Sequence, residues 1–551
     1  MTITEAAPVR PDGGRSPRIQ PGGAGAGRRI ALAALLITCG NVVSRLLGLV
    51  RDQTIAALFG VTAGASIYSA ASRVPTMVYD LLIGGAMTAA LVPVFAEYAA
   101  RDERRRESDP AHPELAPLVG AVLGLALAVL IPSVALLILF ARPLMRLMGV
   151  GFEPAVQEQG VLLVRLALPS VVLLGASAVL MGALYALHRV ALPSFSAAVY
   201  NVGIIVCALA LAPWLGVASL VIGMLAGAAG QLLLQVPGLR GLRIRPRLDL
   251  RHPGVRRILG LYAPVAAGLL VSALVVTLDT RLASATGEGS LAAMRYATTL
   301  VQFPLGLVAT ALSFAVLPVL ARYGAGGARA TGYQQTLSAG IRVALLLIVP
   351  MMVTLMALGL PIVRLLFQRG AFTDEGARLT SLALLVYAPQ LPFVAADQLL
   401  IAAFYALQNT LVPVLVGVAG AALYTAVALG TVGSLGMAGL VLANTVQNSA
   451  HAIVLMALLW RAAGGEWCRG LGAAIGRIAL AGGAMAAILV GMQHVVAPPQ
   501  PVLGLGAYLA GMIAISGAVY LAVLAVLGSE ELGFARDLVA RRLRRSAGGP
   551  P

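Results

Sequence analysis

The chain alternates between long apolar segments and short polar ones over most of its 551 residues. A helix that crosses the hydrocarbon core of a bilayer needs about 20 mainly apolar residues. The pattern therefore predicts an all-α polytopic membrane protein with about 14 transmembrane helices. These candidate spans lie near residues 30–58, 65–96, 115–141, 157–186, 191–212, 215–236, 258–282, 290–320, 336–359, 376–405, 411–431, 435–460, 471–494 and 502–527.

Three sequence blocks repeat in the same order at a nearly constant shift, which indicates an internal duplication. The block ALYAL (183–187) returns as AFYAL (403–407), and ALVPVFAEY (90–98) returns as AVLPVLARY (315–323). A third block, ARPLMRLMGVGFEP, begins at residue 141 and resembles GLPIVRLLFQRGAFTD further along the chain. Because each copy holds six spans, an even number, both copies enter the membrane in the same orientation. We expect two parallel-repeat six-helix lobes followed by two further helices, an architecture of transporters that hold substrate between the halves.

These patterns divide the chain into six parts, and the terminal parts are rich in Gly, Pro and Arg, which is typical of disorder. The expected parts are a basic N-terminal tail at 1–28, a first lobe at 29–236, a basic cytoplasmic loop at 237–257, a second lobe at 258–460, two further spans within 461–528 and a basic cytoplasmic tail at 529–551.

Composition agrees with a membrane location. The chain is 59% apolar and 11% charged, whereas soluble domains carry about 25% charged residues. The net charge is +17 and every basic residue is an arginine. The arginines gather at 101–106, at 237–257 and in the C-terminal tail, all on one side of the expected membrane. The positive-inside rule explains this distribution without nucleic acid binding and predicts a plasma-membrane protein with both termini in the cytoplasm.

Nothing in the sequence favours catalysis, a metal or a cofactor. The three cysteines are scattered and odd in number, which indicates neither a disulfide framework nor a metal site. The five histidines show no ligand spacing, and the motifs of metalloproteases, phosphate-binding loops and serine hydrolases are absent from the sequence. We therefore expect a protein that is not an enzyme and that binds no metal or cofactor.

The segment Asn41–Tyr98 is unusual because charged side chains lie inside two membrane-length apolar helices. Each such charge costs roughly 2.5–3.5 kcal/mol at the bilayer centre, so these side chains should face protein or a water-filled cavity. Arg45 and Asp52 share one helix face at a spacing that Arg73 and Asp80 repeat on the next helix. This spacing spans about 10 Å along a helix, which is too far for a direct bond within either helix.

Together with charges of the seventh and eighth expected spans, these side chains form the candidate substrate-binding site. An excess of arginine in a water-filled cavity selects anions, because guanidinium pairs with phosphate and carboxylate through two parallel hydrogen bonds. The alternative is a set of internal salt bridges that hold the two lobes together. A polar patch on the twelfth expected span either lines the opposite wall or packs helices. The site comprises Arg45, Arg51, Asp52, Arg73, Asp80, Asp279, Arg281 and Arg295, and the patch comprises Asn444, Gln447, Asn448 and His451.

Several blocks of the chain resemble the MurJ/MviN lipid II flippase family of the MOP exporter superfamily. They are SRLLGLVRD (44–52), ALFG (57–60), RVPTMVYDLLIGGAMTAALVPVFAEY (73–98), RYATTLVQFPLGLVATALSFAVLPVLARY (295–323) and QRGAFTDE (368–375). The resemblance covers about residues 30–530. It implies fourteen spans in two six-helix lobes, with helices 13 and 14 forming a groove for a lipid tail.

The resemblance also implies a function and partners. The cargo would be the undecaprenyl-pyrophosphate-linked precursor of peptidoglycan, lipid II, moved from the inner to the outer leaflet by alternating access. Membrane lipids and cell-wall synthesis or division proteins would be the other partners. Some family members bind sodium through helices 7 and 11, but the span at 411–431 has no Asp, Glu or Asn, so we do not expect that site.

Family arginines carry over to Arg45 and Arg51 directly. Arg295 lies four residues before a position where the family has an arginine, on the same helix face, and could substitute for it. The family's usual residue types are missing at Ser66, Tyr79 and Thr299. These departures imply a divergent branch of the family, of the actinobacterial type.

Other functions compete with a lipid II flippase. A MATE-type drug or cation antiporter of the same superfamily would need an acidic cavity for cationic drugs, and the arginine excess argues against one. A flippase for another polyprenyl-linked saccharide uses the same chemistry and stays open. A non-transporting scaffold for cell-wall enzymes would have little surface to offer, because the polar tails are short.

Overall fold

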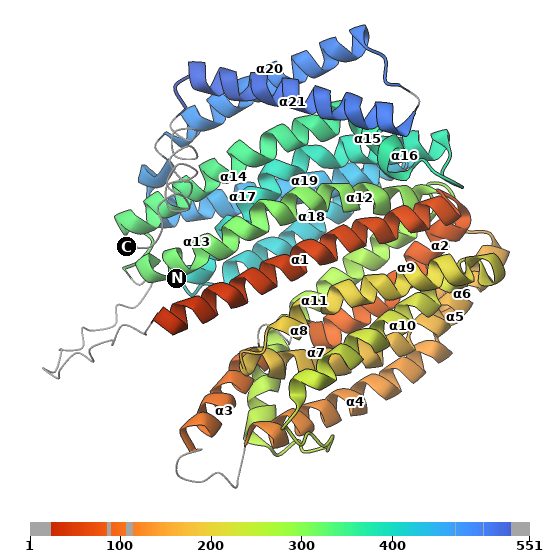
Figure 1. Ribbon diagram of the computed structural model, residues 1–551, viewed down its shortest axis with the longest axis vertical. Coiled ribbons are helices and arrows are strands. Elements are labelled where there is room, and N and C mark those ends of the chain that lie inside the picture. The colour runs from red at the N-terminus through yellow and green to blue at the C-terminus, as the bar shows by residue number, and fades with distance from the viewer. Residues whose placement is uncertain are drawn as a thin grey trace, which may run out of the picture.

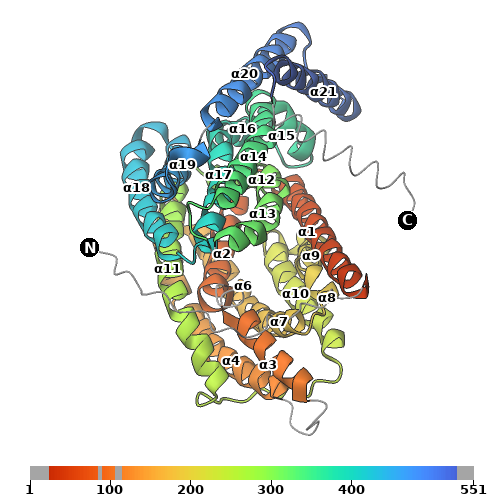
Figure 2. The ribbon, with the colours of Figure 1, turned by 90° about the vertical axis from the view of Figure 1, so that its left-hand side faces the viewer.

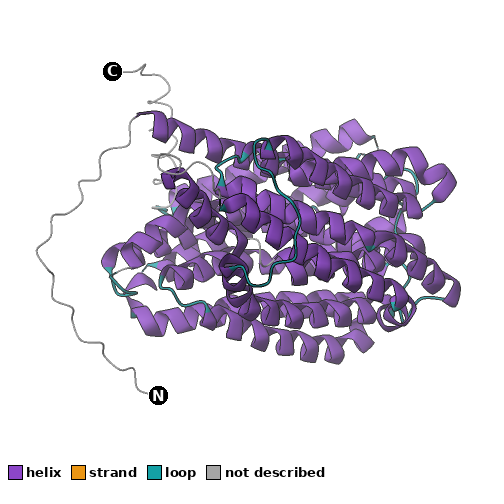
Figure 3. Cartoon of the chain, turned by 90° about the horizontal axis from the view of Figure 1, so that it is seen from below, coloured by secondary structure: helices purple, strands orange, loops and turns teal. Residues whose placement is uncertain are grey.

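The structure is a computed structural model that describes residues 24–84, 90–105, 114–324, 326–468, 470–499 and 501–529. Every regular element within these residues is a helix (Figure 3). The expected N-terminal and C-terminal tails fall mostly outside the described residues. The first helix begins at Ala24 and so extends into the segment expected to be disordered.

The first half of the chain forms a helical series joined by short turns. Thr62 begins the second helix, where its hydroxyl accepts a hydrogen bond from the amide of Ala65 at 3.3 Å and caps the helix. The elements are α1 (Ala24–Phe59), α2 (Ala63–Tyr79), a π-helical turn (Asp80–Gly84), α3 (Val92–Arg105), α4 (Leu115–Leu139), α5 (Ala141–Met148), α6 (Pro154–Ala167), α7 (Pro169–Ala186), α8 (Ala191–Ser194), α9 (Ser196–Leu215) and α10 (Ala218–Gln235).

The second half repeats this order and adds two helices. Its first long helix begins with Pro253, which suits the first helical turn because that turn needs no amide donor there. The elements are α11 (Pro253–Ser284), α12 (Ser290–Leu307), α13 (Ala309–Gly324), α14 (Thr331–Ala357), α15 (Gly359–Phe367), α16 (Asp374–Tyr387), α17 (Leu391–Ala406), α18 (Leu411–Leu435), α19 (Met437–Ala463), α20 (Leu471–Val495) and α21 (Val502–Val526).

The prediction of an all-α polytopic membrane protein is confirmed. Ten helical stretches of the described residues are long and apolar enough to cross a membrane, or 11 when the two parts of α11, bent by 50°, count as one span. The other three expected spans are also helical, as α1, as α2 with α3, and as α12 with α13. These three segments carry six of the eight charged residues of the candidate site, and the other two, Asp279 and Arg281, lie on α11. Charge and local breaks thus set them apart from the purely apolar spans.

Backbone geometry confirms the internal repeat. Within the described residues, His188 and Gln408 are the only residues other than glycine with positive φ, and both have φ of 58°. Each follows the corresponding ALYAL or AFYAL helix end. Gly216 and Gly436 also match, with φ of 52° and 54°, at the ends of α9 and α18. The two halves therefore share turns in detail and not only hydrophobicity.

The halves lie side by side, and the first helix of each also contacts the other half. In Figure 1, α1 crosses the middle of the molecule, with α9, α10 and α4 on one side and α12, α13 and α18 on the other. It packs against α9 and also against α12 and α15. Helix α11 packs against α18 and α19 and also against α4 and α5. Both views place α20 and α21 together at one edge of the bundle (Figures 1 and 2).

The basic segment between the halves is tied to the first half. The Arg247 amide donates to the carbonyl of Gly120 in α4 at 3.1 Å. Helix α3 packs against α4, and its Glu97 forms ion pairs with Arg257 of α11 and with Arg101. Desolvation opposes these pairs, but the two arginines hold the pKa of the Glu97 carboxyl below its usual value. The segment is thus an ordered connection and not a free linker.

At its C-terminal end, α1 meets the second half of the chain at Gly60, in a contact that only glycine allows. Gly60 has φ of +60°, and a Cβ atom there would lie 2.3 Å from the Ala371 carbonyl oxygen. The Ala371 amide donates to the Ala57 carbonyl at 2.8 Å. Tyr296 of α12 donates its hydroxyl proton to the Gly60 carbonyl at 3.1 Å. The end of α1, the loop before α16 and α12 are thereby held together.

Replacing Gly60 by alanine should weaken this contact. We expect G60A to lower the free energy of unfolding by about 1–3 kcal/mol, because the Cβ clashes with backbone and the left-handed φ strains alanine. G433A is the matched control, since nothing lies within 4 Å of a Cβ at Gly433. Thermal unfolding of both variants in one detergent measures the difference. Equal melting temperatures would contradict the contact.

Candidate functional site

The centre of the site is the carboxylate of Asp52 in α1, whose side chain is fully buried, with 0% exposed. It accepts hydrogen bonds from Arg51 Nε at 3.0 Å and from Arg295 Nη2 at 3.3 Å. Thr299, one turn after Arg295 on α12, donates its hydroxyl proton to the second carboxylate oxygen at 2.6 Å. A buried carboxylate is strongly unfavourable unless it is paired and hydrogen-bonded, and these donors provide that pairing. Two guanidinium groups face one carboxylate, so the cluster carries an excess positive charge.

Arg51 is oriented from outside the cluster by α9. Its Nη1 donates to the Asn201 side-chain oxygen at 3.0 Å, and the Asn201 amide donates to the Ser44 carbonyl at 3.1 Å. One asparagine on α9 therefore contacts α1 at two residues, Ser44 and Arg51, that lie about two turns apart. This contact fixes the direction of the Arg51 guanidinium while its exposure of 22% leaves part of it accessible.

Arg295 is oriented by α2. Its guanidinium lies 5.0 Å from the ring centre of Tyr68, within the range of a cation–π contact. Its Nη1 donates to the Ser72 hydroxyl at 3.4 Å, whereas its Nε is buried without a partner among the described residues. The guanidinium therefore retains a donor that the fold does not satisfy.

Thr299 and Ser66 are two positions where this chain lacks the family's usual residues. Thr299 contacts the Asp52 cluster, and Ser66 contacts α12, the helix that carries Arg295. Thr299 bonds to Asp52 as described, so Thr299 and Arg295 share one carboxylate. Ser66 of α2 accepts a hydrogen bond from the Ala292 amide of α12 at 3.3 Å. Small hydroxyl side chains thus connect α1, α2 and α12 at these positions.

Arg45 lies two turns before Asp52 and is exposed. Its Nη1 donates to the Gln302 carbonyl of α12 at 3.2 Å. Its guanidinium occupies the space beside Gly306, where a Cβ atom would come within 1.8 Å of the Arg45 Cζ. Glycine at 306 therefore makes room for the arginine.

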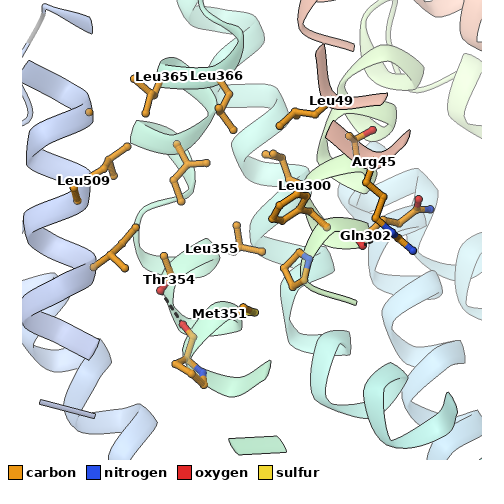
Figure 4. Close-up of a pocket in the computed structure, with 18 of the residues that line it drawn as sticks. Arg45, Leu49, Leu300, Gln302, Met351, Thr354, Leu355, Leu365, Leu366 and Leu509 are labelled. Carbon is orange, nitrogen blue, oxygen red and sulfur yellow. Dashed lines mark hydrogen bonds between the residues drawn. The ribbon is translucent and has the colours of Figure 1, made fainter. Parts of the chain in front are cut away.

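Arg45 and Arg51 stand at the polar end of a large apolar cavity of about 740 Å³. Figure 4 shows Arg45 and Gln302 at one side of this cavity and Leu509 of α21 at the opposite side. The lining between them is mostly aliphatic and comes from α12, α14, α15, α20 and α21. We call this space the apolar cavity. Its lining includes Leu49, Leu300, Met351, Leu355, Leu365, Leu366 and Leu509.

Arg73 of α2 belongs to a second arrangement, between α2, α11 and α18. Its Nη1 lies 2.7 Å from Asp279 Oδ2 and donates to the Thr280 hydroxyl at 2.6 Å. Tyr424 of α18 donates to the other Asp279 oxygen at 2.6 Å. Arg73, Asp279 and Tyr424 line a smaller cavity of about 340 Å³, which we call the polar cavity.

The structure separates the predicted site residues into groups. Arg51, Asp52 and Arg295 form one cluster with Arg45 nearby, and Arg73 pairs with Asp279 in the other arrangement. Asp80 and Arg281 are exposed and form no ion pair with a described residue. Seven residues separate Arg45 from Asp52 and Arg73 from Asp80, and neither pair is bonded.

The polar patch of the twelfth expected span divides as well. Asn444, Gln447 and Asn448 line the polar cavity. His451 instead lies 2.7 Å from the Asp397 carboxylate through its Nδ1. In the described part of the chain, no group of three His, Cys, Asp or Glu residues is placed to hold a metal ion.

Sequence reasoning missed several neutral partners of the charged residues, among them Asn201, Tyr68 and Tyr424. The one signal that could have identified Asn201 is that it is an asparagine in a mostly apolar stretch of α9. The two tyrosines are not distinguishable from other aromatic residues of apolar helices, so the sequence carried no sign of their contacts.

The described helices form a membrane bundle with two repeated halves and charged residues between them, an arrangement that is found in transporters. Solved structures agree: a chain titled "Lipid II flippase MurJ, inward closed conformation" matches with a TM-score of 0.75 at 21% identity, over 92% of this chain and 100% of that one. An inward-facing multidrug resistance MATE transporter matches with a TM-score of 0.62 at 16% identity, over 77% of this chain and 97% of that one.

Sequence comparisons identify the family. The family model described as "Lipid II flippase MurJ" matches residues 55–508. The "Probable lipid II flippase MurJ" of Vibrio cholerae is 30% identical over 91% of this chain and 97% of its own length. The protein of the same description from Rhizobium meliloti is also 30% identical, over 90% of this chain and 94% of its own. This chain belongs to the lipid II flippase MurJ family.

Removing the charge of Asp52 should destabilise the protein more than removing one of its donors. D52N leaves the partly buried guanidinium groups of Arg51 and Arg295 without their counter-ion, so we expect a loss of about 3–5 kcal/mol. T299V removes one hydrogen bond and should cost about 0.5–1.5 kcal/mol. Unfolding of the purified variants in detergent measures both. Equal losses would show that Asp52 does not neutralise the two arginines.

Proposed function

We propose that this protein moves lipid II from the inner to the outer leaflet of the plasma membrane for cell-wall synthesis. The observation that carries the proposal is the position of Arg45 and Arg51 at the polar end of a large apolar cavity, in a chain of the lipid II flippase MurJ family. The protein is a transporter and has no catalytic step in this proposal. Its partners are the undecaprenyl-pyrophosphate-linked precursor and the surrounding membrane lipids.

The two kinds of surface match the two ends of such a molecule. Guanidinium groups bind phosphate oxygens in a planar, bidentate geometry and stay charged at any physiological pH. The aliphatic lining between α14 and α21 suits a polyprenyl tail, because it keeps the apolar surface of the tail out of contact with water. We assign the diphosphate to Arg45, Arg51 and Arg295 and the first part of the tail to the apolar cavity.

Asp52 supplies a way to couple binding to movement. It carries one negative charge and shares its oxygens between Arg51 of α1 and Arg295 of α12. A diphosphate carries more charge and competes for the same donors, so its arrival weakens the link between α1 and α12. Because these helices belong to different repeats, loss of the link favours the rocking of one half against the other that alternating access requires.

The remaining expectations extend this proposal. The lobes at 29–236 and 258–460 would be the rocking units, with the basic loop at 237–257 between them and the helices of 461–528 alongside. By the positive-inside rule, the arginines of 101–106 and 237–257 favour a cytoplasmic location for these two segments, and the proposal puts both termini on the same side. Asp80 and Arg281, which are exposed, would meet the cargo only in another arrangement of the halves.

Two alternatives use the same fold. A MATE-type antiporter for cationic drugs needs negative charge in its cavity, whereas the cluster around Asp52 has an excess of positive charge. A flippase for a different polyprenyl-linked saccharide fits the arginines and the apolar cavity equally well, and cargo binding measurements separate it from a lipid II flippase.

Replacing Arg51 should abolish transport without loss of protein. R51A removes a guanidinium that is held by Asp52 and Asn201, so we expect no complementation of a strain depleted of its lipid II flippase. R142A is the matched control, since Arg142 is exposed and pairs with Glu158 at 2.8 Å away from the cluster. Growth is measured together with the amount of protein in the membrane. Normal growth with R51A would refute the site.

Gly306 offers a test of Arg45 that leaves every charge in place. G306A puts a methyl group where the Arg45 guanidinium lies, so the arginine must move away from Gln302. We expect purified G306A to bind lipid II about tenfold more weakly, which corresponds to about 1.4 kcal/mol. G511A on α21 is the control, because nothing lies within 4 Å of a Cβ there. Unchanged affinity in G306A would remove Arg45 from the site.

A further inference from the structure

We propose that the polar cavity is a subsite for the uncharged part of the lipid-linked cargo, namely its sugar hydroxyl and amide groups. The inference rests on the proposed function and names the portion of the cargo that this cavity recognises. It concerns residues of α18 and α19 that the arginine cluster does not use.

The first observation is that the charges of the polar cavity cancel. Arg73 and Asp279 are its charged lining residues, and they lie 2.7 Å apart as an ion pair. Tyr424 donates to the remaining Asp279 oxygen, so both carboxylate oxygens already have partners. The cavity therefore offers neither a free cation for a phosphate nor a free anion for a metal or a drug cation.

The second observation is the density of carboxamide groups. Each carboxamide has two donors and an acceptor oxygen, which suits hydroxyl and amide groups of a ligand equally. The cavity is lined by Gln302, Gln390, Asn444, Gln447 and Asn448, from α12, the turn before α17, and α19. Five such groups within membrane-length helices are costly unless they find hydrogen-bond partners.

Only part of this set is used by the fold. Asn448 donates to the Gln390 side chain at 2.6 Å and to the Asn444 side chain at 3.1 Å, which ties α19 to the start of α17. The Gln447 side chain forms no hydrogen bond with a described residue and packs beside Gly420 of α18, whose added Cβ would lie 3.5 Å from Gln447 Cγ. The Gln302 side chain likewise has no partner among the described residues. Helix packing explains Asn448, and a ligand or water is needed for Gln447 and Gln302.

The third observation is the order of the surfaces. Gln302 lines both cavities, and its carbonyl accepts the hydrogen bond from Arg45. The apolar cavity, the arginines and the polar cavity therefore follow one another. A polyprenyl diphosphate that carries a saccharide has an apolar tail, a doubly charged linkage and an uncharged hydroxyl-rich and amide-rich group in that same order. The volume of about 340 Å³ limits the polar cavity to a portion of that group.

The test compares ligands that share the tail and the diphosphate. Purified full-length protein in lipid nanodiscs is titrated with undecaprenyl diphosphate, with undecaprenyl diphosphate linked to N-acetylated sugar without peptide, and with lipid II. We expect the wild type to bind both sugar-bearing lipids more tightly than bare undecaprenyl diphosphate. Q447L should weaken the sugar-bearing lipids about tenfold, the upper range for one or two hydrogen bonds, and leave bare undecaprenyl diphosphate unchanged.

Control variants make each outcome decisive. Q335L carries the same change at an exposed glutamine near the start of α14 and should bind all ligands as the wild type does. If Q447L weakens only lipid II, the cavity takes peptide amides and not sugar. If it weakens all ligands equally or none, the subsite is refuted while the flippase proposal stands. If the wild type binds none of the lipids, the proposed function itself fails. Q447N, which retains the amide, should restore part of the affinity and separates hydrogen bonding from a packing defect.

Discussion

The charge of Asp52 is the constraint on which the centre of the molecule depends. A carboxylate in the interior of a membrane bundle must be neutralised and hydrogen-bonded, or it is protonated or exposed. Here the neutralising groups come from two helices that are far apart in the sequence, α1 and α12, and those groups are oriented in turn by Asn201 of α9 and by Ser72 of α2. One buried charge therefore fixes the relative positions of four helices from both repeats.

The contacts at the end of α1 act on the same pair of helices. Tyr296 follows Arg295 directly and bonds to Gly60, which lies eight residues after Asp52. The Asp52 cluster and the Gly60 contact therefore hold the same segment of α1 against α12 at two points. A segment held at two points along its length can pivot when one point is released, which suits the rocking of two packed halves better than the bending of a single helix.

The sequence predicted the class of fold well because length and apolarity are sufficient for a membrane helix. It also predicted the repeat, which His188 and Gln408 confirm in their backbone. It could not predict which charges meet, since an evenly apolar helix gives no indication of its rotation about its axis. Arg51 and Arg281 look alike in sequence, yet one is held in the buried cluster and the other is exposed. The partner of Asp52 across 243 residues, Arg295, was foreseen as a cavity residue but not as its counter-ion.

A carrier must release what it binds, and the distribution of charge addresses this need. If every wall of the site carried arginine, a diphosphate would bind tightly in both states of the protein and shift neither, because only differential affinity moves an equilibrium. Asp52 offsets part of the positive charge and can reclaim Arg51 and Arg295 once the anion leaves. Recognition of the uncharged group by neutral carboxamides such as Gln447 then adds selectivity without increasing the electrostatic attraction that holds the diphosphate. A site that binds the diphosphate through arginines and recognises the uncharged group through neutral carboxamides can therefore bind a charged amphiphile specifically and still release it.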